Sequence, residues 1–165
     1  MVEIMINMRH SMKTGICFGT TSGIITTLGL MVGLNSGTHS SVAVIGGVLT
    51  IAVADALSDA LGIHISEESE CEHTTREIWE STLSTFLSKF IFASSFIIPL
   101  LLFTLSKAVL VSLIWGLILL SLLSFFIARG ENKNPWKVIS EHLIIALIVI
   151  LISNYVGYQI NLMFS

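Results

Sequence analysis

The sequence predicts an all-α membrane protein with five transmembrane helices. Of its 165 residues, 53% are hydrophobic and only 12% are charged. The mean hydropathy of +0.88 is higher than that of ordinary soluble domains. Five apolar segments are long enough to cross a hydrocarbon core about 30 Å thick. They are residues 15–34, 42–65, 83–105, 108–128 and 138–162. Because little chain lies outside them, we treat residues 1–165 as one helical domain.

The charged residues and cysteines exclude several functions. The net charge is −3, and the chain has no basic run with interleaved aromatic residues, so we expect no nucleic-acid binding. Cys17 and Cys71 are too few and too far apart for a disulfide framework or a Cys-x-x-Cys metal site. We expect both to be reduced, and we expect no prosthetic group.

The first span is rich in small residues. Glycines repeat at intervals of four residues in two rows: Gly15, Gly19 and Gly23, then Gly33 and Gly37. Such rows allow membrane helices to approach each other closely. Ser22 and Thr26 add hydroxyls to this helix. These hydroxyls have two equally good interpretations: they donate hydrogen bonds to carbonyls of their own helix, or they are ligands of a bound ion.

The second span contains two carboxylates, Asp55 and Asp59, in an otherwise uncharged segment. An ionised Asp at the centre of a membrane helix costs about 2.5–3.5 kcal/mol. The spacing of four places both carboxylates on one helical face with Gly62 and Ser66. We therefore expect the pair to face a protein interior or a wet cavity, where it shares a proton or holds a cation.

An acidic stretch, residues 66–81, follows the second span. If it continues as a helix, Glu70, His73, Glu77 and Glu80 share a face, a spacing that suits a divalent cation. A solvated surface is the alternative interpretation. The candidate residues for metal capture are Glu67, Glu68, Glu70, His73, Glu77 and Glu80.

The last three spans have fewer polar residues. Pro99 lies in the third span, where we expect it to remove one helix hydrogen bond and kink the axis. The fourth span, residues 108–128, consists almost entirely of Leu, Ile, Val, Ser and Phe and is predicted to face lipid. A basic loop leads through Trp136 into the fifth span.

The distribution of basic residues predicts the orientation. With the N-terminus inside, seven of the eight Lys and Arg residues fall on the inner side, and only Lys107 falls outside. The inner set is Arg9, Lys13, Arg76, Lys89, Arg129, Lys133 and Lys137. The C-terminus is then outside. Asp59 and the acidic stretch lie toward the cytoplasm, with Asp55 deeper.

Four segments resemble those of the vacuolar iron transporter family. Gly19–Leu34 resembles the first-helix motif, an Asp-Gly pair followed nine residues later by Gly-Leu. Ser58–Glu70 is similar to the second-helix signature Ser-Met-x-x-Gly-x-Tyr-x-Ser. Ile98–Leu101 resembles the third-helix Pro-Leu motif, and Pro135–Gly157 resembles the fifth-helix region.

This resemblance implies a homodimeric exporter of Fe²⁺ or Mn²⁺ that exchanges metal for protons. It also implies that an acidic cytoplasmic extension between the second and third helices collects metal. The chain departs from the family at several positions. The family's first-helix Asp falls on Ser22, its second-helix Met on Asp59, its Tyr on His64 and a first-helix Pro on Thr27. The acidic extension is reduced to a single stretch.

The residues and the resemblance together predict a transport site at Asp55 and Asp59. Oxygen ligands without Met favour harder ions such as Mn²⁺, Mg²⁺ or Ca²⁺. Two neighbouring carboxylates also titrate as a coupled pair, which suits exchange of protons for a cation. The predicted neutral ligands are Ser22, Thr26 and Ser58, and His64 is predicted to act as a gate or relay.

Other functions remain open from the sequence. Loss of the carboxylate at Ser22 favours a degenerate family member or a partner subunit without transport. A separate alternative for the Asp pair is that it only forms hydrogen bonds across a dimer interface. The Asp-x-x-x-Asp spacing resembles lipid-headgroup transferases, but their preceding Asp-Gly-x-x-Ala-Arg is absent, so we expect no enzyme. The small size and the lack of an organelle-targeting extension favour a prokaryotic plasma membrane.

Overall fold

The chain forms a bundle of long helices in the computed structural model, which describes residues 9–164. No strand occurs among these residues. Five helical segments are long and apolar enough to cross a membrane: His10–Thr38, Ser41–Glu70, Thr75–Leu102, Leu105–Gly130 and Pro135–Phe164. Each overlaps one predicted span, although the third segment ends at Leu102 rather than at residue 105. Residues 1–8 and 165 of the predicted domain lie outside the described part.

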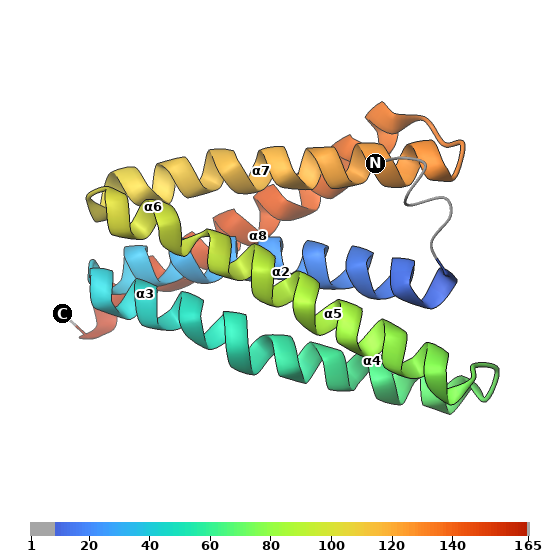
Figure 1. Cartoon of the computed structure of the whole chain (residues 1–165). Helices are drawn as coiled ribbons and strands as arrows, with labels where there is room; N and C mark the ends of the chain where they lie inside the picture. The colour runs from blue at the N-terminus through green and yellow to red at the C-terminus, as the bar shows by residue number, and fades with distance from the viewer. Residues whose placement is uncertain (1–8, 165) are drawn as a thin grey trace.

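The five segments run back and forth between the two ends of the bundle (Figure 1). The beginning of α2 (His10–Thr38) lies at the same end as the turns at 71–74 and 131–134. The turns at 39–40 and 103–104 lie at the other end, together with the end of α8 (Pro135–Phe164). Helix α2 is central, because it packs against every other long segment and most extensively against α8 and the third segment.

Two of the five segments are interrupted. The second consists of α3 (Ser41–Thr50), a π-helical turn η1 (Ile51–Asp55) and α4 (Ala56–Glu70). The third consists of α5 (Thr75–Ser95) and α6 (Ile97–Leu102), with a turn at Phe96. Pro99 has no N–H to donate to the Ser95 carbonyl four residues earlier, so the break occurs where a proline kink is expected.

The glycine rows lie where α2 meets its neighbours. Side-chain carbons on Gly15, Gly19 and Gly23 would meet α5, and those on Gly29, Gly33 and Gly37 would meet α8. At Gly19 and Gly33 the nearest atom across the interface is a backbone carbonyl oxygen, Thr85 O or Ser153 O. The predicted role of these glycines in close helix approach is therefore confirmed.

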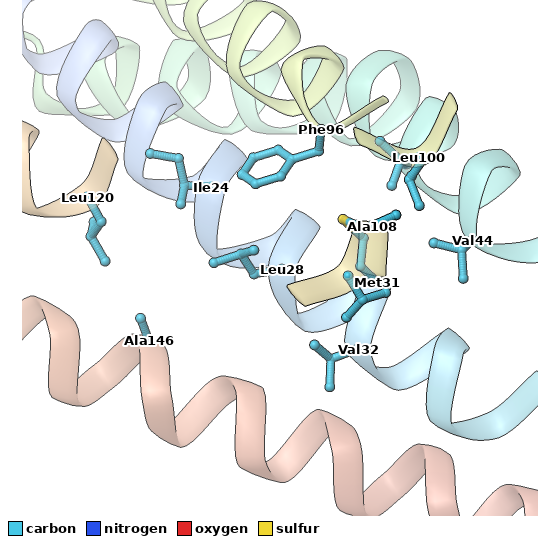
Figure 2. Packing of buried hydrophobic residues seen from close by; sticks show 12 residues of the cluster. Ile24, Leu28, Met31, Val32, Val44, Phe96, Leu100, Ala108, Leu120 and Ala146 are labelled. Carbon is cyan, nitrogen blue, oxygen red and sulfur yellow. The ribbon is translucent and has the colours of Figure 1, made fainter. Parts of the chain in front are cut away.

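The buried residues divide the bundle into an apolar half and a polar half. Figure 2 shows the apolar half, where Ile24, Leu28 and Met31 of α2 pack with Phe96 and Leu120. The other half, toward the 71–74 turn, holds most of the buried polar side chains, including Ser11, Thr20, Glu67, Ser81, Thr85 and Lys89, whereas Thr27 and Ser112 are buried in the apolar half. Lys89 lies at the boundary, because the next buried residues along its segment are Ala93 and Phe96.

The fourth segment, α7 (Leu105–Gly130), is predicted to face lipid, but one of its faces packs inside the bundle. One row of its residues, four apart, is buried in the bundle: Ala108, Ser112, Gly116, Leu120, Ser124 and Ala128. A side-chain carbon on Gly116 would meet the side chain of Leu28 on α2. The row of small residues explains this close packing, and only the remaining faces of α7 lie on the outer surface of the bundle.

Candidate cation site

The centre of the site is the ammonium group of Lys89 on α5, a side chain that is 0% exposed. Its Nζ lies 2.5 Å from Oδ2 of Asp55 and 2.5 Å from Oδ2 of Asp59. The same Nζ donates to the Ser22 hydroxyl at 3.0 Å, and that hydroxyl donates to Asp59 Oδ2 at 2.6 Å. Three oxygen atoms from two helical segments therefore converge on one cationic atom.

The local sequence explains how three segments meet here. Gly23 on α2 has no side chain, so the Lys89 backbone and stem lie directly against it. Asp55 is the last residue of the π-helical turn, and Asp59 lies one helical turn later in α4. A π turn within a longer helix is uncommon and often occurs at functional sites.

The site lies deep between the two ends of the bundle. Asp55 and Lys89 are each near the middle of helical segments of 30 and 28 residues. At a rise of 1.5 Å per residue, each lies about 20 Å along its segment from the nearer end of the bundle. Charges this deep need partners, because an unpaired buried ion costs several kcal/mol. The ammonium and the two carboxylates meet this requirement for one another.

The two carboxylates differ in their surroundings. The side chain of Asp59 is 21% exposed, whereas that of Asp55 is 39% exposed. Asp55 therefore reaches the outer surface of the bundle near the middle of its helical segment.

The other predicted site residues do not join this cluster. The Thr26 hydroxyl donates to the Ser22 carbonyl at 2.7 Å, which is the back-bonding alternative. Ser58 is exposed on the surface of α4. His64 lies closer to the 71–74 turn, with Nδ1 2.9 Å from the Thr82 hydroxyl and its ring against Trp79.

The acidic stretch is not the continuous helix that one of our interpretations required. Helix α4 ends at Glu70, Cys71 adopts a left-handed conformation with φ of 56°, and α5 begins at Thr75. Thr74 and Glu77 form a capping box that starts α5. The expected shared face of Glu70, His73, Glu77 and Glu80 is therefore wrong.

The six residues predicted to capture metal do not gather around one point. Glu67 is buried and accepts a hydrogen bond from Ser81 at 2.8 Å. Glu70 pairs with His73 at 3.3 Å, and Glu80 pairs with Arg9 and Arg76. Glu68 is exposed. Across residues 9–164, no group of three or more His, Cys, Asp and Glu side chains lies close enough together to hold a metal ion.

Lys89 is the residue that the sequence reasoning placed wrongly. It was counted among the basic residues of the inner side, but it lies within the bundle. Removing it from the seven leaves six, all at the end of the bundle that holds the 71–74 and 131–134 turns, against Lys107 at the other end. The available signal was its isolation, since no other charged residue occurs between Ser81 and Ser106.

No protein-family model, curated protein or solved structure matches this chain. The resemblance to the vacuolar iron transporter family therefore depends on the four sequence segments alone. The fold and the Lys89 cluster are properties of this chain, and they are the basis of the functional argument.

Proposed function

We propose that the chain is a membrane transporter that exports a divalent transition metal, Mn²⁺ or Fe²⁺, from the cytoplasm in exchange for protons. The observation that supports this proposal best is the convergence of three oxygens on the Lys89 ammonium at 2.5, 2.5 and 3.0 Å. A bound divalent cation would use the same three oxygens as part of its coordination shell, and the ammonium serves as its stand-in. Carboxylates in the middle of a membrane helix are expensive and mostly functional.

The donor set suggests which ions the site accepts. It consists of two carboxylates and one hydroxyl, with no thioether or imidazole within the cluster. Such oxygen donors suit Mn²⁺ and Mg²⁺ better than soft ions. We therefore rank Mn²⁺ before Fe²⁺ as the transported metal. Carboxylates that release a metal ion are also able to accept protons, which provides the exchange.

The direction of transport in this proposal follows from charge. Six basic residues lie at the end of the bundle that holds the 71–74 turn, so we assign this end to the cytoplasm. Most of the buried polar side chains lie in the same half, between that end and Lys89, whereas Thr27 and Ser112 are buried in the other half. A cation from the cytoplasm would enter through the polar half and leave through the apolar half after a conformational change.

A second copy of the chain is part of the proposal. The α3–η1–α4 segment has its own row of small residues four apart, and all are exposed: Gly46, Thr50, Ala54, Ser58, Gly62 and Ser66. The comparable rows on α2 and α7 are covered by other helices. A second copy packed on the exposed row would cover it and would shield the exposed part of Asp55 from lipid.

One observation favours a second candidate function, a membrane subunit without transport of its own. Lys89 already pairs with both carboxylates, so the cluster needs no further ion to be stable. In that case the three charges hold α4 and α5 together, and the protein acts through a partner. This function predicts that metal has no effect on the cluster.

Flux measurements separate the two candidates. We would reconstitute the protein in liposomes, impose a pH gradient, and follow Mn²⁺, Fe²⁺ and Co²⁺ entry for wild type and for Asp55→Asn/Asp59→Asn. We expect gradient-driven flux in wild type, highest for Mn²⁺, and none in the double variant. The control is Glu72→Gln, an exposed carboxylate that belongs neither to the cluster nor to the predicted capture residues. An inactive wild type supports the subunit function, and an active double variant rules out the paired-acid site.

A further inference from the structure

We infer that Lys89 is a tethered cation that competes with the transported metal for Asp55 and Asp59. This inference depends on the proposed function, and it adds how the site is occupied when no metal is bound. The two carboxylates of the wild-type protein then bind either of two cations: the Lys89 ammonium, which is part of the chain, or a metal ion from solution.

The geometry makes the two cations mutually exclusive. Nζ of Lys89 lies 2.5 Å from an oxygen of each carboxylate and 3.0 Å from the Ser22 hydroxyl. A divalent ion bound to the same oxygens would sit 2.0–2.6 Å from them, so it would overlap the ammonium. Repulsion between the two positive charges also prevents them from binding together, and a low-dielectric interior screens this repulsion poorly.

Burial restricts where the ammonium can go. The Lys89 side chain is 0% exposed, and its Cα and Cγ lie against Gly23. Within the described part of the chain, Asp55 and Asp59 have no salt-bridge partner other than Lys89. The side chain must therefore change its rotamer within the bundle for a metal to enter, which couples metal binding to a local rearrangement.

The competition also affects affinity and selectivity. A metal ion gains the carboxylate interactions only by giving up those of the ammonium, so the wild-type site binds more weakly than the same oxygens would alone. A monovalent ion offers the carboxylates no more charge than the ammonium does. A divalent ion offers twice as much, so the lysine selects for divalent ions while keeping release possible.

Mn²⁺ binding to the purified protein tests this inference without any transport assay. We would measure free Mn²⁺ by electron paramagnetic resonance during titration of wild type, Lys89→Met and Lys89→Arg. We expect the Kd of Lys89→Met to be at least tenfold lower than that of wild type, and that of Lys89→Arg to stay close to wild type. The matched control is Lys107→Met, an exposed lysine at the other end of the bundle, which should not change the Kd.

Two further measurements complete the test. The variant Lys89→Met/Asp55→Asn/Asp59→Asn should lose the tight binding. In wild type, Lys89 is the one fully buried lysine among residues 9–164, so its ¹⁵Nζ resonance should be distinguishable. Saturating Mg²⁺ should shift that resonance, which requires no substitution and so remains informative where Lys89→Met does not fold.

The outcomes distinguish this inference from the proposed function. The inference is overturned by a Lys89→Met protein that binds Mn²⁺ no more tightly than wild type, or by an unchanged Lys89 resonance in Mg²⁺. If either result is found while metal flux in liposomes is normal, the proposed transport function is retained and the competition by Lys89 is rejected. If no variant binds Mn²⁺ and no flux occurs, both fail.

Discussion

Gly23 on α2 packs directly against Lys89 on α5, so that a side-chain carbon on Gly23 would lie 3.2 Å from the Lys89 Cα and 3.3 Å from its Cγ. The contact between α2 and α5 at Gly23 therefore lies at the residue that holds the charged cluster together, whereas the two helices approach more closely at Gly15 and Gly19. A change in the separation of α2 and α5 therefore moves the Lys89 ammonium relative to the Ser22 hydroxyl on α2.

We predict a graded effect of alanine along this glycine row. At Gly23 the neighbouring atoms must move by a few tenths of an ångström, whereas at Gly19 the new carbon would overlap the Thr85 carbonyl oxygen. Overpacking costs about 1–3 kcal/mol, so Gly19→Ala should lower the melting temperature more than Gly23→Ala. The melting temperatures of the two variants can be compared by thermal unfolding in detergent, monitored by circular dichroism.

The chain offers a matched control for this series. Gly62 is also in a helix interior, but a side-chain carbon there has no atom within 4 Å. Because Ala is favoured over Gly in helices by about 0.8–1.0 kcal/mol, Gly62→Ala should preserve or raise the melting temperature. A melting temperature for Gly19→Ala as high as that of Gly62→Ala would contradict the close packing.

A second prediction concerns the energetics of the charged cluster. Removing one partner of a buried ion pair costs about 3–5 kcal/mol, because the remaining charge stays buried. Lys89→Met should therefore destabilise the protein strongly, and Lys89→Met/Asp55→Asn/Asp59→Asn should recover much of the loss. Unfolding free energies for the single, double and triple variants give the coupling. A triple variant as unstable as the sum of its parts would mean that the three groups act independently.

The two carboxylates should not be equivalent, which is a third prediction. Asp59 accepts hydrogen bonds from both Ser22 and Lys89 and is less exposed than Asp55. Asp59→Asn should therefore lower stability more than Asp55→Asn. Ser22→Ala should lessen this difference by removing one of the bonds to Asp59. Equal losses for the two Asn variants would show that the Ser22 bond contributes nothing.

The spans and the glycine rows were predictable because both are local sequence patterns. A run of about 20 apolar residues specifies a membrane helix whatever its neighbours are. Glycines four residues apart predict a close helix contact, but they do not identify the partner helix. Here the two rows on α2 contact different helices, α5 and α8. The Asp55 and Asp59 pair was found for the same reason, since both residues lie on one helix four positions apart.

Lys89 was missed because its partners are on other helices. Which residues of α5 face α2 and α4 depends on how the helices are packed, and one sequence contains no direct signal for that. The break after Glu70 was missed for a different reason. Cys71 adopts the left-handed conformation that Gly or Asn usually provides, so no breaker residue marks it. The sequence Thr74-Thr75-Arg76-Glu77 did contain a capping-box signature, which was the available evidence for a new helix.

A fourth prediction concerns the turn between α7 and α8. Lys133 hydrogen-bonds to Glu131 at 2.7 Å and lowers the pKa of that carboxyl below its ordinary 4.5. A lowered pKa stabilises the turn above pH 4.5, and this stabilisation is lost as the pH falls through the lowered value. Lys133→Gln should raise the pKa of Glu131 toward 4.5, measured by ¹³C resonance of the carboxyl. Lys137→Gln is the control, and an unchanged pKa in Lys133→Gln would contradict the pairing.

The final prediction concerns the exposed row on α4. If a second copy packs there, Ser58 of one copy lies near the same row of the other, as in an isologous interface. In a background of Cys17→Ser and Cys71→Ser, Ser58→Cys should form a disulfide-linked dimer under mild oxidation in membranes. Leu151→Cys, which is also exposed but lies on α8, should remain monomeric. Gly62→Phe should abolish the cross-link, because a large side chain holds two small-residue rows apart. Cross-linking at Leu151 but not at Ser58 would move the interface to α8 and leave Asp55 exposed to lipid.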